Sequence, residues 1–145
     1  MEEYEDYSDE TLIQMMEDSY DLDESMFFVL GELGSRKHPR VEEFCLKAIN
    51  DHLGYDEHFV SSAIRNLYRV NEYKAIEQIN EHLDSFHIYT IGRILSLLWP
   101  DSSIYMEMPE KEGLIDTLKE FLDKKNEADI SKIQHDYDEF IKAYG

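Results

Sequence analysis

The sequence is poor in cysteine, proline and glycine. Cys45 is the single cysteine among 145 residues, so no disulfide can form within the chain. Three prolines and six glycines leave few fixed breaks, which favours helices over turns and short strands. No apolar run approaches the ~20 residues that span a bilayer. The stretch MEEYEDYSDE lacks the basic and apolar parts of a signal peptide, and we therefore expect a cytoplasmic protein.

Basic residues are also scarce, and they are unevenly placed. The formal net charge is −19, and residues 1–35 contain twelve acidic residues and no lysine or arginine. Such a surface repels nucleic-acid phosphates and anionic membranes, and it speeds encounter with a basic protein. We therefore expect a protein partner and no nucleic acid or membrane partner. General solubility is the alternative explanation of this charge.

What the sequence does contain is apolar residues at helical spacing. Apolar residues make up 42% of the chain, and ten Tyr, seven Phe and one Trp supply large surfaces for a core. The spacing predicts an all-α fold in one domain, 1–145, with residues 1–8 as a flexible acidic N-terminus. Eight helices are predicted. The first two start near Asp9 and Met26, and the other six cover about 41–53, 57–70, 75–83, 88–99, 111–124 and 128–144.

Residues typical of helix ends mark several boundaries. Ser8 or Asp9 can cap the first helix and Asp56 the fourth. Gly34 suits the left-handed position after the second helix, and Pro39 suits the first turn of the third. The sequence therefore predicts a tight helix–helix turn over 34–38.

The apolar pattern recurs after 34 residues, which places Val41 on Ala75, Cys45 on Ile79 and Ile49 on Leu83. Repeated helical hairpins of this length form stacks, because one hairpin cannot bury its apolar face alone. The stretches VLGELGSRKHPRVEEFCLKAI and AIRNLYRVNEYKAIEQI resemble HEAT-like repeats. This resemblance implies a short stack of helical hairpins, a HEAT-like α-solenoid of about three repeats plus flanking helices. An irregular helical bundle built from the same hairpins is the alternative.

No pattern in the sequence indicates an active site, a metal site or a cofactor. Asp21, Asp23, Ser25 and Glu32 have the spacing of a calcium loop, but the glycine required at its sixth position is Met26. The six histidines lack zinc and di-metal spacings. Cys45 lies on an apolar face, which predicts a buried, unreactive thiol rather than a nucleophile. We expect a protein without catalytic activity; an enzyme that uses Asp, Glu and His remains a third hypothesis.

Two acidic surfaces with tyrosines are the candidate binding sites. On a helical wheel Tyr73, Glu77, Glu81 and Asp84 fall together, opposite the apolar side of their helix. The 34-residue shift adds Glu43, and in stacked hairpins these residues would share one concave face. The second candidate is the N-terminal acidic block with Tyr4, Tyr7, Asp18, Tyr20, Asp21 and Asp23. The loop residues Ile104, Tyr105, Met106 and Met108 are a third, and an ordinary solvated face is the alternative for all of them.

Size, acidity and degenerate repeats together resemble the small helical immunity proteins of bacterial toxin systems, including contact-dependent growth inhibition. This resemblance implies an inhibitor that is monomeric when free and binds one cognate, basic toxin domain, such as a nuclease, to occlude its active site. The alternative is a helical scaffold or adaptor that binds a peptide or partner protein through its concave groove.

Overall fold

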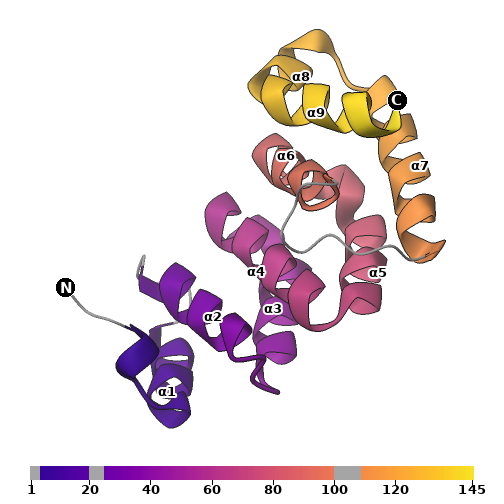
Figure 1. Cartoon of the computed structure of the whole chain (residues 1–145). Helices are drawn as coiled ribbons and strands as arrows, with labels where there is room; N and C mark the ends of the chain where they lie inside the picture. The colour runs from indigo at the N-terminus through magenta and orange to yellow at the C-terminus, as the bar shows by residue number, and fades with distance from the viewer. Residues whose placement is uncertain (1–3, 20–24, 100–108) are drawn as a thin grey trace. The chain divides into compact units, whose positions relative to one another are not determined.

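The computed structural model describes residues 4–19, 25–99 and 109–145, and these form helices joined by turns (Figure 1). No strand occurs in these three ranges, so the predicted all-α class is confirmed. Among the residues described, no helix is both long and apolar enough to cross a membrane. The chain divides into two compact units, Met1–Glu72 and Tyr73–Gly145, which are described separately below. The prediction of one domain over 1–145 stays a prediction.

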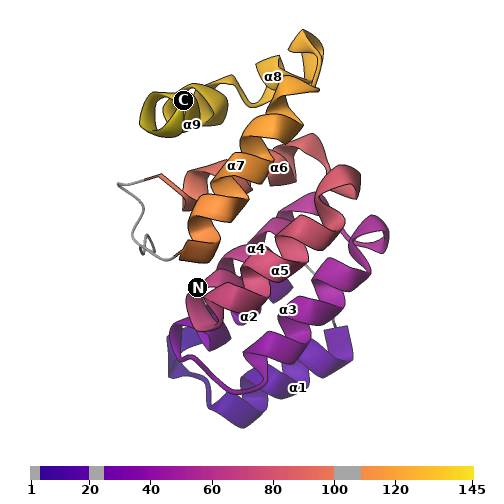
Figure 2. The same ribbon diagram turned by 90° about the vertical axis from the view of Figure 1, so that its right-hand side faces the viewer.

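In its described residues, 4–19 and 25–72, unit 1 contains four complete α-helices and two short 3-10 helices. In chain order they are η1 (Tyr4–Asp6), α1 (Asp9–Ser19), α2 (Ser25–Ser35), α3 (Val41–Asn50), η2 (His52–Gly54) and α4 (Glu57–Val70). Helix α4 packs against both α2 and α3, and α1 packs against α2 (Figure 2). The buried side chains of α3 are those expected from the sequence, namely Val41, Phe44, Cys45, Ala48 and Ile49.

Two predicted helix caps are confirmed. The Ser8 hydroxyl accepts a hydrogen bond from the backbone N–H of Thr11 at 3.2 Å, which satisfies one free donor at the start of α1. The Asp56 carboxylate accepts a hydrogen bond from the N–H of His58 at 2.8 Å and does the same for α4. Both helices therefore begin where the sequence indicates.

The turn between α2 and α3 differs from the prediction. Gly34 is helical, and the left-handed residue is Lys37, with φ of 53°. The N–H of Lys37 donates to the carbonyl of Gly34 at 3.0 Å, and the N–H of His38 donates to that of Leu33 at 3.2 Å. This pair of bonds forms a Schellman motif with lysine at the position that glycine usually takes. Pro39 precedes α3 rather than lying in its first turn.

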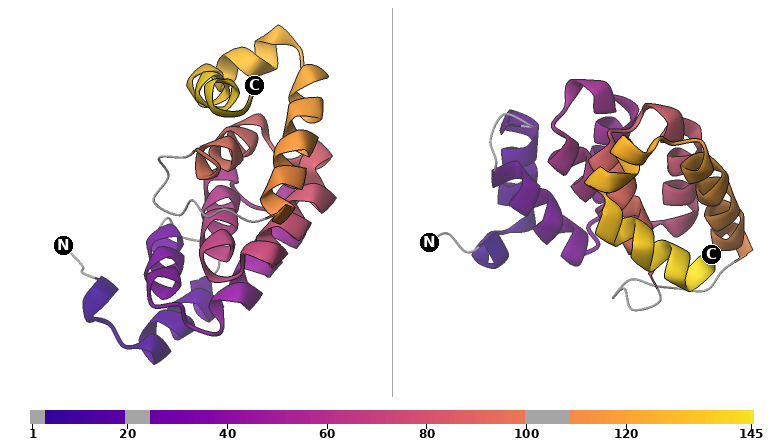
Figure 3. Two further views of the ribbon diagram at one scale, coloured as in Figure 1. Left: turned by 45° about the vertical axis from the view of Figure 1, so that its right-hand side comes forward. Right: turned by 90° about the horizontal axis from the view of Figure 1, so that it is seen from above.

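Unit 2 contains α5 (Glu72–His82, which starts at the unit boundary), η3 (Leu83–Ser85), α6 (Ile88–Leu97), α7 (Pro109–Asp123), α8 (Glu127–Lys132) and α9 (Gln134–Tyr144). Helix α9 packs on α6 (Figure 3). The Lys119 ammonium of α7 donates to the carbonyl of Tyr144 at 2.9 Å. The Tyr144 hydroxyl in turn donates to the carbonyl of Leu98, so polar contacts attach the last turn of α9 to α7 and to the end of α6.

The predicted helix over 128–144 is two helices, α8 and α9. Ile133 separates them with φ of −127° and ψ of 32°, and its side chain is buried. A Cβ built on Gly92 would lie 2.8 Å from Cγ2 of Ile133, so the isoleucine packs directly on the glycine of α6. The break therefore brings an apolar side chain into the core where a continuous helix was expected.

Candidate functional site

Helix α5 has one buried and one exposed face, as its sequence predicts. Its buried residues are Ala75, Ile76, Gln78 and Ile79. Tyr73 is 63% exposed, and Glu77 and Glu81 are exposed at successive turns. Asp84, in η3, is exposed as well. We call Tyr73, Glu77, Glu81 and Asp84 the α5 stripe.

Among the described residues, only one carboxylate of the α5 stripe forms an ion pair. Lys74 forms an ion pair with Glu77 at 3.2 Å, and this is an exposed pair of the i,i+3 type. Such surface pairs contribute about 0–1 kcal/mol and open readily to another partner. Within the described ranges, Glu81 and Asp84 form no ion pair. Both carboxylates are exposed to solvent.

Glu43, the fifth predicted residue, lies on α3 in unit 1 and has a different environment. Its carboxylate accepts a hydrogen bond from Nε of Arg40, whose Nη1 also bonds Glu17 of α1. The same guanidinium lies over the ring of Phe44, 4.9 Å from its centroid. The chain's own arginine therefore balances Glu43, which makes it the weakest member of the predicted set. The concave groove expected from the repeat stays a prediction.

Several residues of the other predicted sites fall outside the described residues. These are Tyr20, Asp21 and Asp23 of the N-terminal block, and the loop residues Ile104, Tyr105, Met106 and Met108. Three acidic residues of α1, namely Glu10, Glu17 and Asp18, are exposed. An acidic surface in the N-terminal third of the chain thus remains part of the candidate site.

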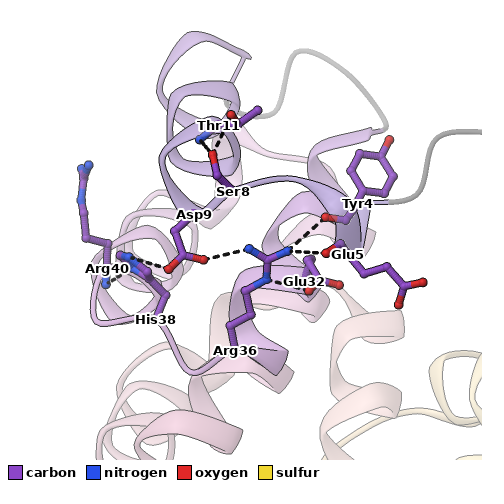
Figure 4. A network of polar contacts seen from close by, with 9 residues as sticks. All are labelled: Tyr4, Glu5, Ser8, Asp9, Thr11, Glu32, Arg36, His38 and Arg40. Carbon is purple, nitrogen blue, oxygen red and sulfur yellow. Dashed lines mark hydrogen bonds and ion pairs between the residues drawn. The ribbon is translucent and has the colours of Figure 1, made fainter.

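Arg36 is a structural centre that the sequence did not single out. Its Nη1 donates to Asp9 at 2.8 Å and its Nε donates to Glu32 at 2.8 Å. Its Nη2 donates to the backbone carbonyls of Tyr4 at 3.2 Å and Glu5 at 3.1 Å (Figure 4). One guanidinium thereby joins η1, α1 and α2. The bonds to Asp9 and then Glu32 raise the pKa of Arg36 above its ordinary value.

The position of Arg36 in the sequence was the available signal. It is the first base after 35 residues that hold twelve acids, so it has many possible partners in the preceding part of the chain. Glu32 also stands four residues before it, which is a favourable spacing for a helical ion pair. The contacts to Asp9 and to the carbonyls of η1 span 27 to 32 residues, and periodicity cannot predict contacts of that range.

Two kinds of chemistry can be compared with the described residues, namely thiol chemistry at Cys45 and metal binding. Cys45 is fully buried, as predicted, and burial raises the pKa of its thiol to about 12. A thiol with such a pKa supplies almost no thiolate at neutral pH. In the part of the chain that the structure describes, no group of three or more His, Cys, Asp or Glu residues is arranged to hold a metal ion.

No protein-family model matches this chain, and comparisons with curated proteins and with solved structures gave no significant match.

Proposed function

We propose that the protein binds a basic partner protein through the α5 stripe and performs no chemistry itself. The observation that carries the proposal is the composition of that stripe. Three exposed carboxylates and a tyrosine that is 63% exposed follow one another along α5 and η3, and the residues of α5 between them include a buried set. Only Glu77 is paired with a base of the described chain. Tyrosine provides a rigid contact surface at small entropic cost, and carboxylates provide charge-assisted hydrogen bonds.

The charge of the whole chain supports the same kind of partner. At −19, the protein is repelled by nucleic acids and by anionic surfaces, whereas a basic protein is drawn to it over a Debye length of ~8 Å at physiological salt. Charge pairs that form close contacts in such interfaces couple by roughly 1.5–7 kcal/mol. A few well-placed carboxylates therefore suffice for tight and selective binding.

Within this class we propose an immunity protein that neutralises a cognate toxin domain. A domain that cleaves nucleic acid needs a basic surface for its substrate, and exposed carboxylates can occupy that surface in place of phosphates. The inhibitor then blocks the active site without any catalytic group of its own. The buried Cys45 is consistent with such a role.

We also propose that the hairpins belong to a HEAT-like stack. The supporting observation is that the positions related by 34 residues are buried in both copies: Val41 and Ala75, Cys45 and Ile79, Ile49 and Leu83. A scaffold or adaptor that holds a peptide by apolar anchors is the competing function. The two functions differ in their response to salt, because an apolar contact is hardly screened.

The test uses charge reversal on two helices of the same unit. The first variant carries Glu77→Lys and Glu81→Lys. The matched control carries Asp116→Lys and Glu120→Lys, two exposed acids at the same i,i+4 spacing on α7. Wild-type protein is immobilised, and the proteins it retains from a lysate of the source organism are identified. The retained protein is then purified, and its association rate and affinity are measured with each variant.

The proposal predicts a basic partner whose activity on nucleic acid stops when the wild-type protein is added. Reversal on α5 should weaken binding at least about tenfold, and reversal on α7 should have a much smaller effect. An acidic partner contradicts the proposal, as does equal binding by the two variants.

A further inference from the structure

Unit 1 carries a group of aromatic rings that are exposed to solvent. Phe27 and Phe28 lie in the first turn of α2, and their side chains are 43% and 58% exposed, respectively. Full burial of a phenylalanine stabilises a protein by about 1.5–3 kcal/mol, so two adjacent exposed rings are a costly arrangement. Exposed aromatic groups of this kind mark interaction sites more often than isolated surface residues do.

The exposed rings are joined to two tyrosines of the N-terminal segment. The rings of Tyr4 and Phe28 are stacked, with centroids 6.1 Å apart and an interplanar angle of 6°. Phe27 meets Phe28 edge-on at 5.4 Å, and Tyr7 meets Tyr4 edge-on at 5.9 Å. Tyr7, Tyr4, Phe28 and Phe27 thus form a continuous chain of rings, which we call the aromatic cluster.

Arg36 ties the backbone that carries Tyr4 to α2. By accepting hydrogen bonds from this guanidinium, the carbonyls of Tyr4 and Glu5 are fixed relative to α2, which carries Phe28 (Figure 4). The N–H of Tyr7 donates to the carbonyl of Tyr4 at 3.1 Å, so the second tyrosine is positioned by the same segment. The cluster is therefore organised before any partner arrives, which lowers the entropic cost of binding.

Carboxylates border the aromatic cluster. Glu5 and Asp6 lie between the two tyrosines in η1 and are exposed. Neither forms an ion pair with any described residue. Arg36, the nearest base in the sequence, is already bonded to Asp9 and Glu32. The surface therefore combines ring faces of partial negative potential with carboxylates that are not neutralised.

This combination matches one side chain better than any other. A guanidinium is planar, so it stacks on aromatic faces, and its fork of donors pairs with carboxylates at the same time. A lysine ammonium is a strongly hydrated point charge that cannot form both contacts equally well. A second copy of this chain is disfavoured as occupant, because it brings a net charge of −19 to an acidic surface.

We propose that the aromatic cluster is a second docking surface, which binds an arginine-bearing segment of a basic partner protein. This inference rests on the proposed function only in taking the partner to be basic. It concerns a different surface, on unit 1, and a preference for arginine over lysine that the α5 stripe does not require.

The test uses the whole protein and two synthetic probes, hexa-arginine and hexa-lysine, both acetylated and amidated. The two peptides carry equal charge, so the ratio of their dissociation constants removes the general attraction of an acidic protein. Titration calorimetry at 0.15 M salt gives the ratio for wild type, for Phe28→Ala and for Leu53→Ala. Leu53 is the matched control, because it is an apolar residue of unit 1 that is 82% exposed and lies in η2, away from the cluster in the sequence.

We expect wild type to bind hexa-arginine about fivefold more tightly than hexa-lysine, as one or two exposed cation–π contacts predict. Phe28→Ala should reduce this ratio toward one, and Leu53→Ala should leave it unchanged. Equal binding of the two peptides by wild type overturns the inference, and so does an equal effect of the two substitutions. The peptide experiment changes no residue of α5. The proposed function is tested with the natural partner and the α5 and α7 variants, so either proposal can fail while the other holds.

Discussion

The backbone of Gly34 in α2 lies directly against the side chain of Asn66 in α4. A Cβ built on Gly34 would be 2.0 Å from Oδ1 and 2.8 Å from Cγ of Asn66. Asn66 is buried and cannot easily move aside, because its Nδ2 donates to the carbonyl of Ser62 at 2.9 Å. Gly34 is therefore required for close helix packing in unit 1, and a left-handed backbone conformation is not the reason for it.

Gly34→Ala should destabilise the protein by about 1–3 kcal/mol, since the methyl group overpacks the contact between α2 and α4. The measurement is urea denaturation followed by circular dichroism. Gly31→Ala is the control in the same helix, because nothing lies within 4 Å of a Cβ at Gly31. That substitution should stabilise the protein by about 0.5–1 kcal/mol through helix propensity alone. Equal effects of the two substitutions would mean that α2 and α4 do not meet at Gly34.

Arg36→Lys should release η1 while leaving the helices of unit 1 formed. Lysine keeps the charge but lacks the rigid fork that reaches two carboxylates and two carbonyls together. Hydrogen exchange of the Tyr7 amide should accelerate, because the carbonyl of Tyr4 that accepts its bond is no longer held. Arg40→Lys is the control, since Arg40 bonds Glu17 and Glu43 and not η1. Unchanged exchange in Arg36→Lys would show that η1 is held by other contacts.

Local sequence signals predicted much of the fold. Side-chain caps need only two or three residues, so Ser8 and Asp56 were found correctly. The helical period placed Cys45, Ile79 and other core residues on buried faces, because burial follows the period within one helix. For the same reason the exposure of the α5 stripe was predictable.

The remaining features depend on contacts between distant segments. The sequence suggested Gly34 rather than Lys37 for the left-handed position, and it does not reveal that Asn66 occupies the space beside Gly34. The break at Ile133 depends on its packing against Gly92, 41 residues away. The stacking of Phe28 on Tyr4 joins two segments that are far apart in the sequence, so no local pattern reveals it.

The thiol of Cys45 should be unreactive in the folded protein. Burial raises its pKa to about 12, whereas a thiol in an unfolded chain has a pKa of about 8.5. The folded state therefore holds the proton more tightly, and this contribution to stability is lost as the pH rises from about 8.5 to 12. Ellman's reagent at pH 8 should modify the thiol only as fast as the protein unfolds. Rapid modification without denaturant would contradict the burial of Cys45.

Asp136 should make the protein less stable at neutral pH than at mildly acidic pH. Burial against α6 raises the pKa of this carboxyl, although Arg93 and His135 partly oppose the shift. The pKa of Asp136 is higher in the folded protein than in the unfolded chain, where it is about 3.9. Stability is therefore lost as the pH rises from about 3.9 through the folded pKa. Asp136→Asn should therefore weaken the fall in stability over this range. Asp138→Asn, an exposed carboxyl of the same helix, is the control and should leave the fall intact.

The most direct test of the proposed binding surface is the association rate of the natural partner as a function of salt. Wild-type protein and the Asp116→Lys, Glu120→Lys variant should both associate rapidly at 0.05 M salt and slow steeply toward 0.5 M. The Glu77→Lys, Glu81→Lys variant should associate slowly at low salt and show a much flatter dependence. If reversal on α5 and reversal on α7 give the same rates at every salt concentration, the α5 stripe is not the surface that meets the partner.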